Sequence, residues 1–214
     1  MLSIRAKFAF VNTVRYGVGM DDKLNHQHWL NAGLQALAVQ GLQGLRIMQI
    51  AQQLGVTKGS FYWHFSSLEA YQAALLEEWE LRHTQQIIQY VQAQGGDALA
   101  KLRNLMTVTV GADPRLAKAL RAWADTHPQA QAAQARVDHK RLVYLAGLLA
   151  ALGWPQDQAQ TYARWMYCAL IGHFSLQGPP IEAEQIDLIL ATVVPAAVRK
   201  PRRSKKATTP IGTL

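Results

Sequence analysis

Apolar residues recur at helical spacing near the start of the chain. Small and apolar side chains share one face of a helix over 26–40: Trp29, Leu30, Gly33, Leu34, Leu37 and Ala38. Asn25 is placed to cap that helix, and Gly41 stands where a glycine commonly ends one. A shorter amphipathic stretch covers 47–54 and stops at Gly55. The pattern therefore predicts two helices joined by a short connection.

The same periodicity continues toward the C-terminus. Ser66, followed three residues later by Glu69, has the form of a capping box, so a long helix is expected over 67–93. Further helices are expected over about 97–110, 114–125, 128–152, 156–177 and 182–199. No stretch shows the strict alternation typical of a strand. The predicted fold class is all-α, with a small N-terminal three-helix domain and a larger C-terminal helical bundle.

The segment 45–65 has features that would make a short helix project from its support. Ala51 is small enough for a second helix to approach closely, and Gly55 permits the positive φ that a tight turn between helices needs. Val56 is expected to be buried in the turn, and Phe61 and Phe65 are expected to anchor the next helix to the core. The outward side chains of that helix are Thr57, Lys58, Ser60, Tyr62 and His64. Short polar groups, a cation and a phenol on a rigid apolar back are typical of a DNA recognition helix.

This segment resembles the DNA-binding signature of the tetracycline-repressor (TetR) family. The matching residues are Ile50, Ala51, Gly55, Val56, Lys58, Gly59, Tyr62, His64 and Phe65, followed by the helix start at Glu69. The likeness covers roughly residues 26–75. It implies a helix-turn-helix DNA-binding domain over 20–66 and a ligand-binding and dimerisation domain over 67–199. It also implies a homodimer that binds palindromic double-stranded operator DNA.

The resemblance further implies a set of DNA-contacting residues: Arg46, Thr57, Lys58, Gly59, Ser60, Tyr62, Trp63 and His64. Four of them are expected to face base edges or the groove wall: Lys58, Gly59, Ser60 and Tyr62. Thr57, Tyr62 and His64 are expected to contact phosphates. Trp63 is expected either to pack on the sugar-phosphate backbone or to buttress its own helix. Leu68 departs from the family, which commonly has a lysine there, so a phosphate contact is expected to be missing.

The C-terminal half is similar to one recurrent type of TetR-family regulatory domain. Aromatic side chains with a few polar tips suit an apolar or amphipathic effector, and the candidate pocket residues are Met106, Trp123, Tyr144, Tyr162, Trp165 and His173. Ordinary core packing is the competing interpretation for each of them. Arg121 or Arg141 is expected to pair with Asp138 or Asp125 inside the bundle, in a structural role. The sequence does not identify the small-molecule effector.

The helices over 156–177 and 182–199 have more apolar surface than the outside of one bundle needs. The residues concerned are Ala163, Met166, Tyr167, Leu170, Ile171 and Phe174 in the first helix, and Ile186, Leu188, Ile189, Ala191, Val193 and Val194 in the second. Pairing with a second subunit would bury them in a four-helix interface. Cys168, in the first of these helices, is expected to be a buried and inert thiol.

The charge of the chain is concentrated at its two ends. The formal net charge is +8, but residues 1–19 hold three bases and residues 199–214 hold six, while the rest has 13 bases against 14 acids. The charge is therefore weak evidence for a nucleic-acid partner. Residues 1–19 are interpreted as an N-terminal extension, with Met20 as an alternative start of translation. Residues 200–214 are predicted to be a basic disordered tail.

The cysteine content, the length of the apolar runs and the motifs that are missing each exclude a class of protein. A single cysteine allows no internal disulfide and fits a reducing compartment, so a cytoplasmic location is expected. No apolar run reaches the length of a membrane span. We find no phosphate loop, nucleophile elbow or metal-ligand cluster, and we expect no enzyme activity, cofactor or metal. The predicted function is a repressor whose operator binding is relieved by a ligand. A ligand-independent DNA-binding module controlled by a protein partner and an enzyme built on a helical bundle are the alternatives.

Overall fold

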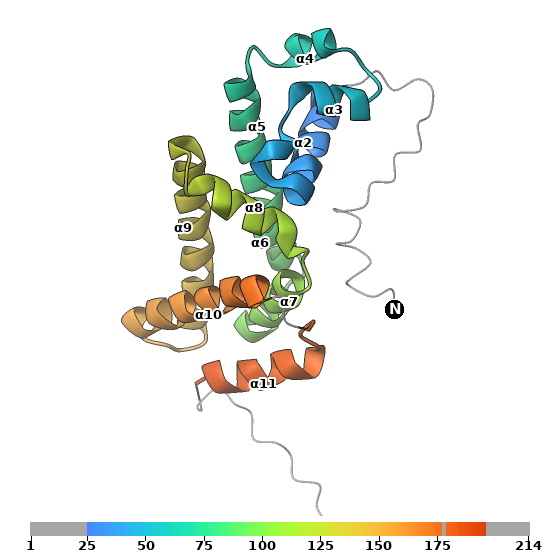
Figure 1. Ribbon diagram of the computed structural model, residues 1–214. Coiled ribbons are helices and arrows are strands. Elements are labelled where there is room, and N and C mark those ends of the chain that lie inside the picture. The colour runs from blue at the N-terminus through green and yellow to red at the C-terminus, as the bar shows by residue number, and fades with distance from the viewer. Residues whose placement is uncertain (1–24, 177–178, 196–214) are drawn as a thin grey trace, which may run out of the picture.

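The computed structural model describes residues 25–176 and 179–195, and every regular element in those ranges is helical (Figure 1). The N-terminal elements are α2 (His26–Gln40), the 3₁₀ turn η1 (Gly41–Gly44), α3 (Ile47–Gln53) and α4 (Lys58–His64). They are followed by α5 (Leu68–Glu80), the π-helical turn η2 (Leu81–Gln85), α6 (Gln86–Ala93), α7 (Ala98–Val110), α8 (Pro114–Ala124), α9 (Pro128–Ala151), α10 (Gln156–Leu176) and α11 (Ala183–Val193). The predicted all-α fold class is confirmed.

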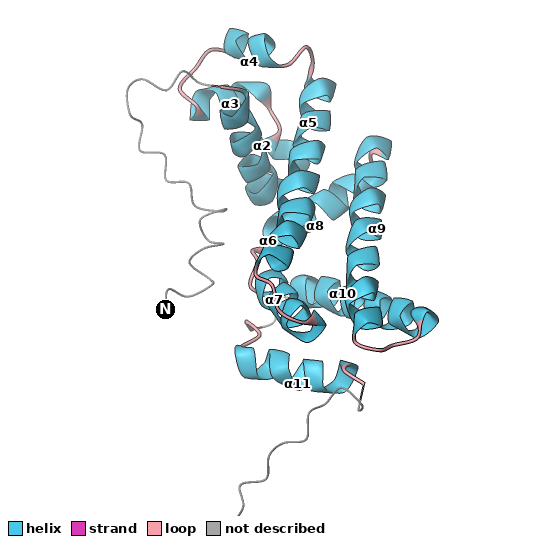
Figure 2. Cartoon of the chain, turned by 180° about the vertical axis from the view of Figure 1, so that it is seen from behind, coloured by secondary structure: helices cyan, strands magenta, loops and turns pink. Residues whose placement is uncertain are grey.

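The helices form an elongated molecule with α3 and α4 at one end and α11 at the other (Figures 1 and 2). One buried core joins α2 to α5 with α8 and the first half of α9, and a second core joins α7, the second half of α9, α10 and α11. Helix α8 packs against both α2 and α9. The small N-terminal helices therefore share a core with helices of the larger bundle.

Two predicted caps can be compared with the structure. Asn25 caps α2 as predicted: its side chain accepts a hydrogen bond from the amide of His28 at 3.2 Å. At the next long helix, Ser67 rather than Ser66 is the cap, and its Oγ accepts from the amide of Ala70 at 3.1 Å. Ser67 has extended backbone, with φ −155° and ψ 171°, so the helix begins one residue later than the capping-box pattern predicts.

Two helices differ from their predicted form. The helix predicted over 67–93 is present, but η2 interrupts it with a π-helical turn, a feature often found at functional sites. The last helix ends at Val193 instead of 199, because Val194 precedes Pro195 and takes extended backbone with φ −85° and ψ 129°. Residues 196–199, the predicted extension over 1–19 with Met20, and the predicted tail over 200–214 lie outside the described residues.

Four aromatic side chains form the centre of the N-terminal core. Trp29, Phe61 and Tyr71 are fully buried, and Phe65 is 4% exposed. The Phe61 ring meets the Trp29 and Tyr71 rings edge-on, each at a centroid distance of 5.4 Å. Tyr71 Oη donates a hydrogen bond to the Trp29 carbonyl at 2.6 Å, which ties α5 to α2. A Cβ at Gly33 would lie 2.0 Å from Tyr71 Oη, so this contact requires glycine.

We expect Gly33→Ala to lower the free energy of unfolding by about 1–3 kcal/mol, because the added methyl group displaces Tyr71 from α2. Gly147→Ala in α9 is the matched control, since a Cβ there meets nothing within 4 Å. The control is expected to keep or slightly raise stability. Urea denaturation followed by circular dichroism measures both, and equal stability of the two variants would contradict the assigned role of Gly33.

Candidate functional site

The turn between α3 and α4 is built as the sequence predicts. Gly55 has φ +71°, in the left-handed region that favours glycine. The amide of Val56 donates to the Ala51 carbonyl at 2.9 Å, and the amide of Gly55 donates to Gln52 at 3.1 Å. Val56 is half-buried against the core rather than fully buried as predicted. The chain therefore reverses sharply after α3 and leads into α4.

Helix α4 has one buried face and one exposed face. Phe61 and the adjoining Phe65 are buried as predicted, whereas Tyr62 is 52% and Trp63 89% exposed. The Lys58 ammonium lies 5.9 Å from the centre of the Tyr62 ring, within the range of a cation–π contact. Trp63 does not buttress its helix, because it points into solvent. In Figures 1 and 2, α4 stands at the outer end of the molecule.

The other predicted DNA-contacting residues surround this face. Arg46, Thr57 and Gly59 are exposed, while Ser60 and His64 are half-buried. Arg46 donates to Gln43 Oε1 at 3.3 Å. Thr57 occupies the N-cap position of α4, although its side chain makes no capping hydrogen bond. The structure thus brings all eight predicted residues to one end of the molecule.

Gly59 is a glycine that the fold does not require. A Cβ at this position would meet only Thr57 Oγ1, at 3.5 Å, which is an ordinary van der Waals distance. No positive φ is found there. Because Gly59 is exposed and has no side chain, another molecule can approach the α4 backbone closely beside Lys58.

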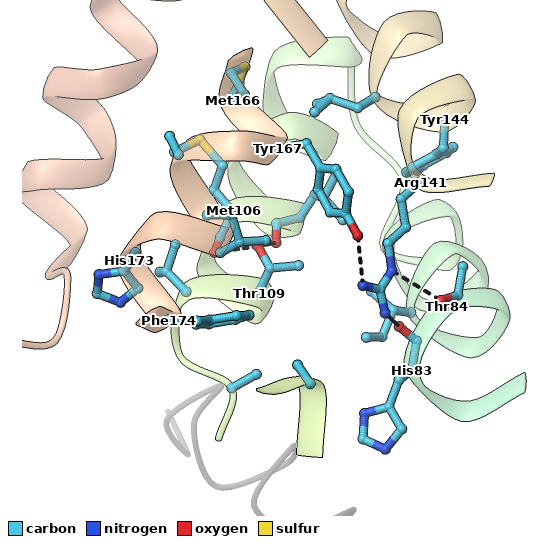
Figure 3. Close-up of a pocket in the computed structure, with 18 of the residues that line it drawn as sticks. His83, Thr84, Met106, Thr109, Arg141, Tyr144, Met166, Tyr167, His173 and Phe174 are labelled. Carbon is cyan, nitrogen blue, oxygen red and sulfur yellow. Dashed lines mark hydrogen bonds between the residues drawn. The ribbon is translucent and has the colours of Figure 1, made fainter. Parts of the chain in front are cut away.

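A cavity of about 270 Å³ lies between the α5–η2–α6 rod and helices α7 to α10 (Figure 3). Four predicted pocket residues line it: Met106, Tyr144, Trp165 and His173. The prediction that Trp123 and Tyr162 line the pocket was wrong, because neither is among the residues that line this cavity. Trp123 is 2% exposed in the N-terminal core, on the face of α8 turned toward α2 and α9. Tyr162 packs at a tilt against Trp154, with 4.4 Å between ring centres, and belongs to the other core.

The polar part of the cavity centres on Arg141, as Figure 3 shows. Its Nε donates to Thr84 Oγ1 at 3.1 Å, its Nη1 to Tyr167 Oη at 3.1 Å and its Nη2 to the His83 carbonyl at 2.9 Å. Tyr167 Oη in turn donates to Asp138 at 2.7 Å. The π-helical turn η2, which contains His83 and Thr84, therefore lies directly against the cavity.

The predicted ion pair inside the bundle is present for Arg121. Its Nη2 lies 2.9 Å from Asp138 Oδ1 and also donates to Tyr167 Oη at 3.0 Å. Arg141, the alternative, has no acid of the described residues within ion-pair distance, so Arg121 is the residue that makes the predicted pair. The position of Arg141 gave a signal that the sequence reasoning missed: this residue follows Val137 and precedes Tyr144 and Leu145 on the inward face of α9, where a charged residue is unusual.

Some apolar residues of α10 and α11 are buried inside the chain and others lie on its surface. Several predicted interface residues are buried: Ala163, Tyr167, Ile186, Val193 and Val194. Met166, Leu170, Phe174 and Ile189 line the cavity. Trp165, Leu176 and Leu188 are exposed, at 57%, 83% and 69%. Cys168 is exposed too, so the prediction of a buried thiol was wrong; it lies one turn after Trp165, on the outer face of α10.

Among residues 25–176 and 179–195, no group of three or more histidine, cysteine or acidic side chains could hold a metal ion. No helix in the same part of the chain combines the length and apolarity needed to cross a membrane.

His83 should make stability depend on pH. Burial, with Arg141 and Arg82 nearby, lowers the pKa of His83 to about 4 from 6.5. Between these values the unfolded chain binds more protons than the folded protein, so folding weakens as the pH falls from 7 to 5. We expect a loss of about 1 kcal/mol from this residue, because its ring keeps some contact with solvent.

Urea denaturation at several pH values measures the effect. His83→Gln should flatten the dependence between pH 7 and 5, whereas His139→Gln, at an exposed position on α9, should leave it unchanged. Parallel curves for the wild type and His83→Gln would contradict the assignment.

Comparison with known proteins identifies the N-terminal region. The model of the family described as "Bacterial regulatory proteins, tetR family" matches residues 30–70. The HTH-type transcriptional regulator TtgW of Pseudomonas putida is 41% identical over 54 residues, which are 25% of this chain and 40% of that protein. The HTH-type transcriptional regulator AcrR of Shigella flexneri is 32% identical over 84 residues, 37% of each chain. The chain thus matches well under half the length of these relatives.

The fold extends the likeness beyond the matched sequence. The crystal structure of a TetR transcriptional regulator from Legionella pneumophila superposes with a TM-score of 0.66 at 14% identity, over 82% of this chain and 100% of that one. At such low identity the superposition shows the fold alone. The matched family region contains α3, the Gly55 turn and α4, which present the exposed face described above. Residues 30–70 therefore match the tetR family of bacterial regulatory proteins in sequence, and most of the chain is similar in fold to a regulator of that family.

Proposed function

We propose that the protein is a transcriptional repressor that binds operator DNA through α4 and is released by a small ligand held in the cavity. The observation that carries this proposal is the construction of α4, which exposes Lys58, Tyr62 and Trp63 on a back anchored by buried Phe61. The tetR-family match over residues 30–70 supports DNA as the partner. We place the protein in the cytoplasm and assign it no enzymatic activity.

The exposed face of α4 fits the requirements of groove recognition. The major groove is about 12 Å wide and admits a single helix. Lys58 can donate to guanine O6 and N7, and its position over the Tyr62 ring restricts its motion before DNA arrives. Thr57 and His64 flank this pair and can contact phosphates. Clearance at Gly59 lets the α4 backbone come close to the groove wall.

A homodimer would place two such helices on one operator. Exposed Trp165, Leu176 and Leu188 on α10 and α11 provide an apolar face at the end of the molecule opposite α4. Burial of that face between two subunits, together with the smaller exposed residues near it, would form a four-helix interface. Two α4 helices about 34–36 Å apart could then enter successive major grooves of a palindrome.

A ligand can influence α4 through α8. This helix packs against α2 and η1 on one side and against α9 on the other. Arg121 of α8 bonds to Asp138 and Tyr167, and Tyr167 accepts a hydrogen bond from Arg141 inside the cavity. A ligand that moves Arg141 therefore acts on a chain of contacts that reaches α2. A coupling free energy of about 1–3 kcal/mol is typical of such linked sites.

DNA binding is tested with Gly59→Ala in band shifts on DNA from upstream of the protein's own gene. Because the fold tolerates a Cβ at Gly59, the variant should keep or gain stability, by about 0.5–1 kcal/mol. We expect its operator affinity to fall by about tenfold or more, the order of one lost base contact. Gly147→Ala should bind like the wild type. Wild-type affinity of Gly59→Ala would contradict groove insertion of α4.

Dimerisation is tested with Leu188→Lys. A charge on this exposed α11 position is expected to raise the dimer dissociation constant by about tenfold or more, because the lysine must be desolvated in the interface. Sedimentation equilibrium measures the change. Val39→Lys is the matched control: Val39 is 61% exposed on α2, and its replacement should leave the dimer intact. Equal dissociation constants for the two variants would place the interface elsewhere.

A further inference from the structure

Arg141 is a cation without an acidic partner in the part of the chain that the structure describes. Asp138, which accepts from Tyr167, and Asp113, which lines the cavity, are each held by another base: Asp138 by Arg121 at 2.9 Å, and Asp113 by Arg115 at 2.6 Å. Glu80 likewise pairs with Arg136 and Lys140, and Glu78 with Arg82. No carboxylate among the described residues lies within ion-pair distance of the Arg141 guanidinium.

The guanidinium is held in position by neutral groups. Its partners are two hydroxyl groups, of Thr84 and Tyr167, and the His83 carbonyl. These bonds use one N–H on each of its three nitrogens, so Nη1 and Nη2 each keep a second N–H. The guanidinium carbon also lies 5.8 Å from the centre of the Trp79 ring. Arg141 is therefore fixed in orientation and still able to donate two further hydrogen bonds.

The rest of the cavity is largely apolar. Met106, Leu145 and Phe174 are among the residues that line it, and Figure 3 shows Met106 and Phe174 across the space from Arg141. Its volume of about 270 Å³ is well above the roughly 150 Å³ of an engineered apolar cavity that binds benzene in another protein. Because a charge in such surroundings interacts strongly with an opposite charge, the cavity favours a ligand that brings one.

We propose that the cavity binds an amphipathic anion, whose carboxylate or similar group meets the free N–H groups of Arg141 while its hydrocarbon part fills the apolar side. This inference rests on the proposed function, because it names the chemical class of the ligand for the same cavity. A planar guanidinium matches the two oxygens of a carboxylate. His83 is neutral at neutral pH and adds no second charge.

The first test uses the unmodified protein. Isothermal titration with decanoate, 1-decanol and decyltrimethylammonium compares one chain length with three charges. We expect decanoate to bind about tenfold to hundredfold more tightly than decanol, the range of a hydrogen bond to a charged group, and the cation not to bind. Equal affinity for acid and alcohol, preference for the cation, or no binding of decanoate would each overturn the proposal.

A second test uses variants. Arg141→Gln should remove the preference for decanoate over decanol and leave decanol affinity within about threefold, because the apolar wall is unchanged. Arg136→Gln, the same change on the outer face of α9, should keep the preference. A preference that survives in Arg141→Gln would overturn the assignment. If that variant does not fold, the comparison of the three probes on the wild type still decides.

Operator release separates this inference from the proposed function. Decanoate that binds with the expected charge preference but does not release operator DNA would support the anion site and contradict ligand-relieved repression. If a neutral or cationic compound releases the operator and decanoate does not bind, ligand-relieved repression is supported and the anion site is contradicted.

Discussion

The contact between Tyr71 and α2 fixes the end of the molecule that carries α4. Tyr71 Oη reaches the Trp29 carbonyl only because Gly33 has no side chain. The buried rings of Trp29, Tyr71 and Phe65 pack on Phe61. Since Phe61 is on the inner face of α4, the aromatic cluster sets both the position of α4 and its rotation about its own axis. Lys58 and Tyr62 face outward as a consequence of packing on the opposite side.

The same cluster connects the exposed helix to the rest of the protein. The N-terminal core includes Leu120 and Trp123 of α8 and Val137 of α9, so no independent boundary separates α2 from the bundle. One turn further along α9, Arg141 enters the cavity. Two packed helices, α9 and α8, therefore connect the cavity to the core on which α4 rests. This arrangement gives a physical route by which a small molecule could alter the angle of α4.

Much of this could be predicted from the sequence, because local patterns determine it. The periodicity of α2, the Gly55 turn and the two phenylalanines specify a helix-turn-helix through short-range geometry alone. The cavity depends on contacts between segments far apart in the sequence, such as Arg141 with Thr84, which are 57 residues apart, so only some of its lining residues were predicted. Trp123 was misplaced because an aromatic residue on a helix fits a core and a pocket equally well. The π-helical turn η2 and the exposure of Cys168 depend on how helices rotate against one another, which spacing does not encode.

The proposed function depends on α4 being the element that enters the DNA groove. Hydrogen exchange with mass spectrometry on the unmodified protein, with and without a bound operator fragment, tests it most directly. Bound DNA should slow amide exchange in residues 57–65 and leave the amides of α10 on its exposed face unchanged. Protection concentrated on α10 or α11, with α4 exchanging at the same rate in both samples, would contradict it.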